Sequence, residues 1–478
     1  MNSGFKEIMD LRGRGMPADG EVTIKGQDPV FSARFKIGET TANILAGVGV
    51  AVTDIHEMKT GKRQKVAIDV RHAAATCQSS KILRQQAADG SWYQVDTPSM
   101  QHMRSITQPW RCKDGRWYLP HFNLPHLHDR VIGVLKCESS ADAVAKAIAK
   151  WDSHDLEEAV AAARACGSII RSNKEWLEHP HGKMLAGKPL VEITKIGDSD
   201  PIPFPKGGRP LSGIKVLDLT RILAGPMAGR TLAENGADVL MVTAKHLPQV
   251  PEHVMDTSHG KRSTFLNLTN PDDVATIKQL ARGTDVFSQG YRPGIMDKHG
   301  MTPEELAKIR PGIIYLSISC YGYGGPLTNR GGWEQIAQCT TGICLDNGDE
   351  RPKLLPASAC DYTTGYNGAY GVLLALARRA REGGSYHVRV SLCRSGMYIY
   401  NQGHVQYPKP DMVLSPADLA PIMAETRTGH GTLRHLAPVL SLSETKPHWD
   451  KPSPVLGSSK PEWLPETKAE VGRRKAEV

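Results

Sequence analysis

The sequence lacks any uninterrupted run of about 18 apolar residues, the shortest stretch that usually spans a bilayer as a helix. Near the N-terminus, acidic side chains come before any apolar core, unlike the order in a secretory leader. We therefore expect neither a membrane-spanning helix nor a secretory leader. The predicted location is intracellular, cytoplasmic by default, with peroxisome and mitochondrion left open.

Disulfide and metal-binding patterns are missing as well. The nine cysteines are scattered and include no C-x-x-C pair, which argues against a disulfide framework and a zinc knuckle. The 18 histidines include no H-E-x-x-H motif, and a catalytic zinc needs several ligands in a defined arrangement. We predict reduced cysteines and no metal.

Aromatic residues are scarce, at 6%, and the basic excess is modest, with 59 Lys and Arg against 50 Asp and Glu. The net charge of +9 suits a negatively charged partner. A nucleic-acid-binding surface should carry a basic stripe with interleaved aromatics, whereas the basic residues here are dispersed along the chain. A small phosphorylated ligand is therefore favoured over nucleic acid.

What is present is a strong α/β pattern. With 478 residues the chain is too long for one compact core, so two to four folding units are expected. Over 211–319, apolar runs alternate with helical segments, which predicts a parallel sheet covered by helices. The expected strands are 214–219, 238–243, 285–288 and 313–317, and the expected helices are 224–235, 271–282 and 303–309. No G-x-G-x-x-G follows the first strand, so a nicotinamide or flavin cofactor loses its main support.

The flanking regions differ from this pattern. Short Ala-rich segments at 140–151 and 154–166, with another helix at 172–178, predict a small, mostly helical domain. A strand is expected at 188–196 and a Pro-rich linker at 201–210. After residue 407 we expect loops and short helices, and from residue 446 an extended or partly disordered stretch.

An internal repeat is suggested by positions 36–73 and 358–395, which share a layout at a fixed offset of 322 residues. Each contains a small-residue helix, a Gly turn and a strand. The helices are expected at 39–58 and 361–381, and the strands at 64–70 and 386–392. Five of the 38 aligned positions are identical, so the shared pattern carries the inference of duplication.

Several segments resemble the class III CoA-transferases, also called the CaiB/BaiF type, a family that includes formyl-CoA transferases and methylacyl-CoA racemases. Residues 211–226 (LSGIKVLDLTRILAGP) are similar to the family's opening strand and turn, and 236–239 (GADV) to its second strand. Residues 259–263 (HGKRS) and 289–294 (QGYRPG) resemble two of its loops. The match continues in the family's order through 321–326, 336–338 and 361–376.

The resemblance implies an α/β fold: a Rossmann-like parallel sheet with helices on both faces, plus a smaller, mostly helical α+β domain. Residues 35–210 resemble the family's later portion yet precede the opening strand, so the chain resembles two family halves fused in swapped order. The implied division is a helix-turn-strand unit at 1–112, the small domain at 113–190, a return strand and linker at 191–210, a Rossmann-like CoA-binding domain at 211–410 and a partly extended tail at 411–478.

Asp361 is the nucleophile that the resemblance implies. In the family, the aspartate at this place attacks an acyl-CoA thioester, giving a mixed anhydride and then an aspartyl-CoA thioester. The position equally fits an N-cap of the following helix, where a carboxylate is expected to keep a low pKa. The implied reaction moves CoA from an acyl-CoA to a carboxylic acid, in a homodimer without a tightly bound cofactor.

Two alternatives remain, a 2-methylacyl-CoA racemase and a non-catalytic CoA-binding relative. Racemases of this family pair the aspartate with a preceding histidine that moves the proton, and Cys360 stands there instead. Glu39, the counterpart of Asp361 in the first repeat copy, is interpreted as a relic or an ion-pair partner.

Binding residues are implied in two groups. Basic side chains on loops at the strand ends are expected to bind the CoA phosphates, with a tyrosine beside the adenine or pantetheine. This group is Lys261, Arg262, Tyr291, Arg292 and Lys298. The oxyanion and acyl pocket is expected to include Gly324, Gly325, Gly331, Gly332, Trp333, Gln338 and Leu223. Leu223 stands where formyl-CoA transferases carry a polar residue, which favours a more apolar acyl group.

Overall fold

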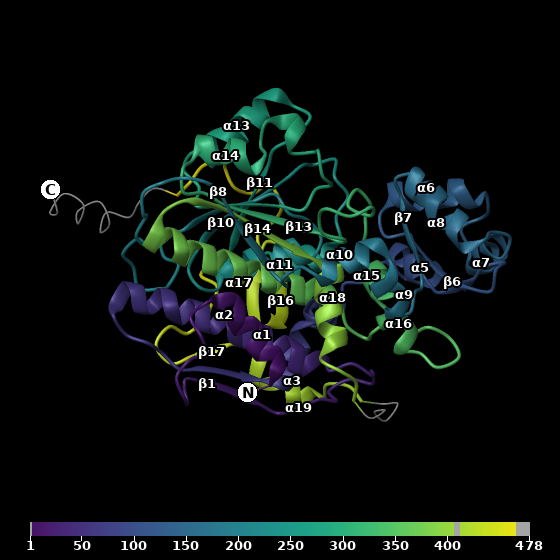
Figure 1. Cartoon of the computed structure of the whole chain (residues 1–478), viewed down its shortest axis with the longest axis horizontal. Coiled ribbons are helices and arrows are strands. Elements are labelled where there is room, and N and C mark those ends of the chain that lie inside the picture. The colour runs from purple at the N-terminus through teal and green to yellow at the C-terminus, as the bar shows by residue number, and fades with distance from the viewer. Residues whose placement is uncertain (1, 406–411, 465–478) are drawn as a thin grey trace.

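A seven-stranded sheet forms the centre of the computed structural model, which describes residues 2–405 and 412–464 (Figure 1). Its strand order is β11-β10-β9-β12-β13-β14-β8. The first six of these strands run parallel to one another, and β8 pairs antiparallel with β14. The strands are β8 (Glu192–Gly197), β9 (Lys215–Asp218), β10 (Asp238–Thr243), β11 (Lys261–Phe265), β12 (Val286–Gln289), β13 (Ile314–Ser319) and β14 (Ser385–Ser391). Numbered along the chain from β9, the parallel strands follow the 3-2-1-4-5-6 order of a Rossmann sheet, which confirms the predicted fold class.

Helices cover both faces of this sheet because successive strand residues point to opposite sides. Val216 packs in the core under α11 (Ala224–Ala233) and α17 (Ala359–Glu382). Leu217 packs in the opposite core, under α13 (Pro271–Ala281) and α14 (Pro303–Ile309). The predicted bounds of β10 and α14 match the structure, and the other predicted elements of this region differ by one or two residues.

One strand was missed. Residues 261–263 of β11 were interpreted as part of a loop from the family resemblance of 259–263, yet β11 pairs in parallel with β10 at the sheet edge. Burial of these polar side chains among ion pairs and hydrogen bonds is what permits a strand there.

The small lobe lies to one side in Figure 1 and has its own hydrophobic core, which includes Tyr118, Val131, Val144 and Leu156. It contains the antiparallel strands β5 (Trp110–Arg111), β6 (Trp117–His121) and β7 (Cys166–Ile169), with α6 (Pro125–Leu135), α7 (Ala141–Ile148), α8 (Ser153–Ala162), α9 (Asn173–Glu178) and α10 (Pro180–Ala186). The prediction of a helix through Cys166 is wrong: α8 ends at Ala162, and β7 follows because it pairs with β6.

The repeat has a clear structural counterpart. Helix α2 (Ile37–Thr60) and α17 are both 24 residues long and begin 322 residues apart. Each leads into a strand, β2 (Val66–Asp69) or β14, and then a helix, α3 (Val70–Thr76) or α18 (Leu392–Asn401). Helices α2 and α17 pack side by side, between the large sheet and a small sheet of β1 (Val22–Lys25), β2 and β17 (Ser441–Leu442) (Figure 1).

The remaining elements fill the space around this stack. They are α1 (Ser3–Arg12), α4 (Ser79–Ile82), α12 (Pro251–Thr257), α15 (Glu334–Thr341), α16 (Ile343–Asp346) and α19 (Pro416–Leu419), with a sheet of β3 (Arg84–Gln86), β4 (Trp92–Tyr93), β15 (Met423–Thr428) and β16 (Gly431–Leu436). Helix α5 (Pro98–Ile106) belongs to the small lobe, where Ile106 packs in the lobe's core (Figure 1). Within residues 2–405 and 412–464, no helix combines the length and apolar character needed to cross a bilayer.

The C-terminal region is more regular than expected, because β15 and β16 form a hairpin where loops were predicted. Residues 446–464 contain no helix or strand but pack on the large sheet. The Trp449 ring lies 4.8 Å from the Arg230 guanidinium, and the Trp463 indole donates to the Leu280 carbonyl. The parts of the predicted tail at 411 and 465–478 lie outside the described residues.

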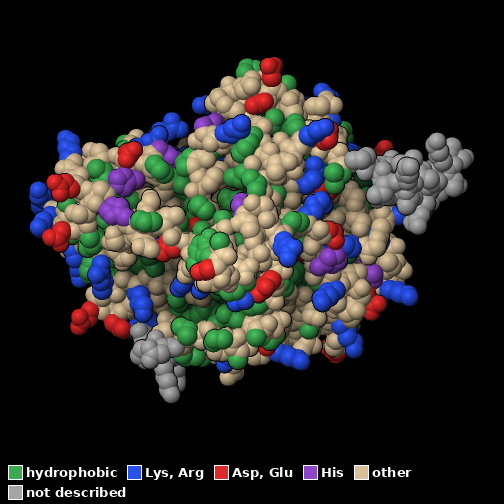
Figure 2. Space-filling model, turned by 180° about the vertical axis from the view of Figure 1, so that it is seen from behind, with side chains coloured by type: hydrophobic (Ala, Val, Ile, Leu, Met, Phe, Trp, Pro, Cys, Tyr) green, Lys and Arg blue, Asp and Glu red, His purple; other side chains and the backbone are tan. Residues whose placement is uncertain are grey.

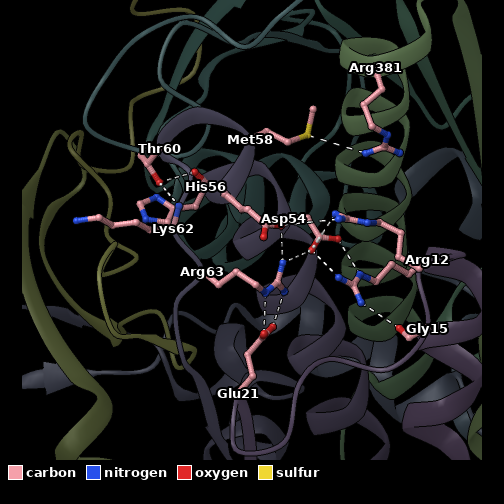
Figure 3. A network of polar contacts seen from close by, with 12 residues as sticks. Arg12, Gly15, Glu21, Asp54, His56, Met58, Thr60, Lys62, Arg63 and Arg381 are labelled. Carbon is pink, nitrogen blue, oxygen red and sulfur yellow. Dashed lines mark hydrogen bonds and ion pairs between the residues drawn. The ribbon is translucent and has the colours of Figure 1, made fainter.

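A charge network fastens α1 to α2 at the end of α2 far from its N-terminus (Figure 3). The Asp54 carboxylate accepts from Arg12 at 2.7 Å and from Arg63 at 3.0 Å, and Arg63 also binds Glu21. Burial alone would raise the pKa of Asp54, but the two guanidinium groups lower it.

On the face of the molecule in Figure 2, Lys and Arg side chains are dispersed and do not form one stripe.

Lys261 has a structural partner. Its Nζ donates to the Asp218 carboxylate at 3.0 Å and to the Pro226 carbonyl at 2.8 Å, and the side chain is 1% exposed. The ion pair joins the edge strand β11 to β9 and α11 in the sheet interior. This position is at odds with the phosphate contact predicted for Lys261.

Replacing Lys261 by Met should lower the free energy of unfolding by about 3–5 kcal/mol, because Asp218 would stay buried without its cation. Urea titration measures the change. The matched control is Lys298→Met at an exposed lysine, which should alter stability by less than about 0.5 kcal/mol. A Lys261→Met chain that keeps its stability and loses CoA binding would restore the phosphate role.

Candidate active site

A cavity of about 390 Å³ opens where β9, β12 and β13 end. Its walls come from the segments that follow these strands, 219–225, 290–295 and 318–320, together with 328–333, Asp361 and Leu392. Leu124, His126, Leu127 and Cys166 close it from the small lobe. In a Rossmann sheet, the strand order reverses between the strands corresponding to β9 and β12, and ligands bind at the carboxyl ends of the strands there.

Asp361 is the one acidic residue among the described residues that line the cavity. The prediction that it caps a helix is wrong: α17 begins at Ala359, its N-cap is Ser358, and Asp361 lies within the first turn. The residue is 8% exposed, toward the cavity. Within the described chain, no hydrogen bond reaches its carboxylate.

Glu334 takes the role of cap. Its carboxylate accepts from the backbone N–H of Cys360 at 3.1 Å and of Asp361 at 2.6 Å, and from the Gln338 side chain at 2.6 Å. It is 4% exposed. The free amides of a helix end need such an acceptor, and Glu334 supplies it from the first residue of α15.

The pKa values of both carboxyl groups are raised. Burial raises the pKa of Glu334 to about 7, although its hydrogen bonds act in the opposite direction. Burial, and then the charge of Glu334, raise the pKa of Asp361 well above its usual range. The expectation of a low pKa at Asp361 is therefore wrong, because the amides of the helix end point at Glu334.

Cationic groups surround the mouth of the cavity. The Arg221 Nε atom has no hydrogen-bond partner, and its Nη2 atom donates to the Pro248 carbonyl. Arg292 donates to the Arg164 carbonyl at 3.2 Å. Among the described residues, neither guanidinium has a carboxylate within 4.0 Å. Burial and the nearby charges of Arg130, Arg221 and Arg292 lower the pKa of His126, so these cations gather without neutralisation.

The structure brings together part of the predicted CoA-binding group. Tyr291 and Arg292 line the cavity. Lys261 and Arg262 do not, and Arg262 binds the Asp238 carboxylate with two nitrogens at 2.8 and 3.0 Å. Lys298 is exposed on a short turn outside the lining. Sequence reasoning missed Arg221, although it lies three residues after the end of β9, inside the quoted opening motif.

The predicted oxyanion and acyl pocket divides in the same way. Leu223, Gly331, Gly332 and Trp333 line the cavity, whereas Gly324, Gly325 and Gln338 do not. Gly325 packs against the His181 ring, and Gln338 holds Glu334 from behind. The Trp333 indole is stacked on the His121 ring, with centroids 5.2 Å apart and planes 7° from parallel.

Glycine is required at two lining positions. A Cβ on Gly331 would lie 2.4 Å from the Arg292 guanidinium, and one on Gly332 would lie 2.2 Å from the Cys320 sulfur. Within the described residues, the N–H groups of these two glycines have no protein acceptor. They are therefore available to a ligand.

Backbone strain marks the turn between β9 and α11. Ile222 has φ +73°, which is a genuine outlier for a β-branched residue. Such strain is retained where surrounding structure enforces it, often at ligand sites. The turn carries Arg221 and Leu223 into the cavity wall.

Cys360 and Glu39, at the starts of the two repeated helices, have different surroundings. Cys360 is fully buried, and burial raises the pKa of its thiol well above the usual range. Glu39 lies outside the cavity lining. Its Oε1 atom accepts from the Asp28 N–H at 3.1 Å, while the Asp28 carboxylate accepts from the N–H of Glu39 at 2.7 Å.

The chain is similar to several known proteins. It is 32% identical over 313 residues to acetyl-coenzyme A transferase nodX of Hypoxylon pulicicidum, covering 60% of this chain and 53% of the relative. It is 29% identical over 416 residues to an acyl-CoA transferase of Gibberella moniliformis, covering 79% and 73%. The chain spans about half the length of most other curated relatives that it matches.

A solved structure of Rv3272 from Mycobacterium tuberculosis is 29% identical, covers 41% of this chain and 59% of that one, and has a TM-score of 0.39. The model of CoA-transferase family III matches residues 211–475. Because this match covers more than half of the chain, the protein belongs to CoA-transferase family III.

Proposed function

We propose that this protein transfers CoA from an acyl-CoA to a carboxylic acid, with Asp361 as the nucleophile. The observation that carries the proposal is a cavity at the ends of the parallel strands whose one lining carboxylate, the buried Asp361, shares the cavity with Arg221 and Arg292. CoA offers the complementary pattern, phosphates at one end and a thioester at the other. The acyl-CoA and CoA-transferase names of the relatives agree with this chemistry.

The reaction is a series of exchanges at one carboxylate. An Asp361 oxygen attacks the thioester carbon, and the C–S bond breaks to give a mixed anhydride and CoA thiolate. The thiolate attacks the aspartyl carbon and releases the donor acid, leaving an aspartyl-CoA thioester. The acceptor carboxylate then attacks the aspartyl-CoA thioester, which gives a second mixed anhydride and CoA thiolate. The thiolate attacks the acceptor's carbonyl carbon, which forms the new acyl-CoA and regenerates Asp361. No proton is gained or lost overall.

Backbone donors are in place for the charges that form. The free N–H groups of Gly331 and Gly332 suit the oxyanion of each tetrahedral intermediate. Ala224 and Gly225, in the first turn of α11, also line the cavity, and a helix N-terminus favours an anion such as a phosphate. Tyr291 supplies a half-buried ring beside this route.

Proton exchange beside the thioester, as in a racemase, is not favoured. That reaction needs a base next to Asp361, and the Cys360 thiol is buried with a raised pKa. Transfer needs only the carboxylate. The homodimer that the family resemblance implies remains a prediction, and the cavity already combines small-lobe residues with residues of the large sheet in one chain.

Asp361→Asn should abolish the covalent CoA adduct and lower transfer by several orders of magnitude. Its stability at pH 8 should rise by about 1–3 kcal/mol, because the variant no longer buries an unpartnered charge. The gain should shrink as the pH falls through about 4, the ordinary pKa of aspartate, because the carboxyl group then becomes protonated in the unfolded chain as well. Intact-mass spectrometry after incubation with acetyl-CoA, and thermal melts, measure the two effects. Glu39→Gln is the matched control and should keep the adduct; loss of the adduct in that variant alone would place the nucleophile in the other repeat copy.

The pH dependence of transfer tests the carboxyl pair. The acid limb of kcat/KM should lie well above pH 4, where exposed aspartates ionise, because the pKa of Asp361 is raised. Glu334→Gln keeps an acceptor oxygen and removes the neighbouring charge, so the limb should move to lower pH. A limb near pH 4 in the parent chain, or one that Glu334→Gln leaves in place, would contradict the coupling.

Arg221→Gln should raise KM for the CoA donor roughly tenfold, because a charge-assisted hydrogen bond to phosphate is lost. The difference from the parent should narrow as salt increases. Steady-state kinetics at low and high ionic strength provide the measurement. Lys298→Gln is the control outside the lining, and an equal rise of KM there would show that the phosphates follow another path.

A further inference from the structure

The polarity of the cavity changes with depth. At the mouth, His126 is exposed, and Arg221 and Arg292 are half-buried. Deeper lining residues are buried and apolar. They are Leu124, Leu127, Cys166 and Leu223, which are 8%, 5%, 2% and 2% exposed, beside Asp361 at 8%.

The inner wall is a continuous hydrocarbon surface. Leu124, Leu127 and Cys166 pack in one hydrophobic cluster with Val250, and Ile222 and Trp333 pack against it. The Trp333 ring is held in place by the His121 stack. The small lobe and the strained β9–α11 turn therefore build one apolar surface next to the nucleophile.

Three polar side chains of the lining already have protein partners. The Thr220 hydroxyl donates to Asp218 at 2.5 Å, and the Ser319 oxygen accepts from the Gly322 N–H at 2.9 Å. Arg330 is paired with Glu157 and Glu158. The nearest cation is Arg292, which lies beside Gly331 and Cys166 and is assigned in the proposed function to a CoA phosphate. A second acyl carboxylate would have to compete with that phosphate, and burying an unpaired charge is costly.

From this gradient we infer that the acyl group handled at Asp361 is a hydrocarbon chain without a second charge. The inference rests on the proposed function and names its substrate class: monocarboxylic acyl-CoA thioesters, with dicarboxylic ones rejected. The cations at the mouth bind the phosphates of CoA, and the buried wall takes the acyl tail.

Butyryl-CoA and succinyl-CoA provide the test, because both acyl groups have four carbons and differ in a terminal methyl or carboxylate. Each is mixed with the intact chain, and the rate of covalent CoA adduct formation is followed by rapid quench and intact-mass spectrometry. We expect butyryl-CoA to react on the order of 100-fold faster or more, since the apolar wall offers the carboxylate no partner.

Leu223→Lys adds a cation to the inner wall and should reduce this preference at least about tenfold. Leu177→Lys is the control, at a leucine that is 41% exposed and outside the lining, and it should keep the preference. If Leu223→Lys does not fold, the comparison in the parent chain still decides.

The outcomes separate the two claims. Succinyl-CoA reacting as fast as butyryl-CoA, or faster, would overturn the hydrocarbon inference and leave the nucleophile intact. Failure of butyryl-, succinyl- and acetyl-CoA alike to form an adduct would overturn the proposed function and the inference together.

Discussion

The hydrogen bonds of the Glu334 carboxylate are the constraint on which the site depends. Glu334 accepts hydrogen bonds from the backbone N–H groups of Cys360 and Asp361. The free amides at the N-terminus of α17 are therefore satisfied by a residue from another helix. The Asp361 side chain is then left facing the cavity with no donor of its own. A helix N-terminus usually stabilises a carboxylate, but here its donors are engaged elsewhere, and burial sets the pKa.

The first repeat copy uses the same device with a different result. Asp28 accepts the N–H groups of Gly38 and Glu39, which occupy the positions of Cys360 and Asp361. Glu39 is turned away into a hydrogen bond with the Asp28 N–H, and Lys36 lies 3.8 Å from it. The first copy instead leads into the small lobe, which closes the cavity over the second. The cavity therefore combines the second copy with the small lobe that follows the first copy, within one chain.

The sequence predicted what depends on local periodicity. The parallel strands, the helices between them and the two repeated helices were expected within a few residues, because apolar spacing defines them. Strand β11 was missed because the sequence does not show that Lys261 and Arg262 are buried in ion pairs. Asp361 and Arg292 were found through motif order. Glu334 as cap and Arg221 as an unpaired cation depend on contacts between distant segments, which no local pattern contains.

The same arrangement makes the Asp361 carboxylate costly to keep in the folded chain. The pKa of Asp361 is higher in the folded chain than in the unfolded one, so the fold loses stability as pH rises above about 4. Glu334 adds to that loss, because its charge raises the pKa of Asp361 further. A covalent bond to an acyl group removes the charge altogether. In the proposed transfer, repulsion from Glu334 would raise the energy of the resting site more than that of the acylated one, which would favour acylation of Asp361.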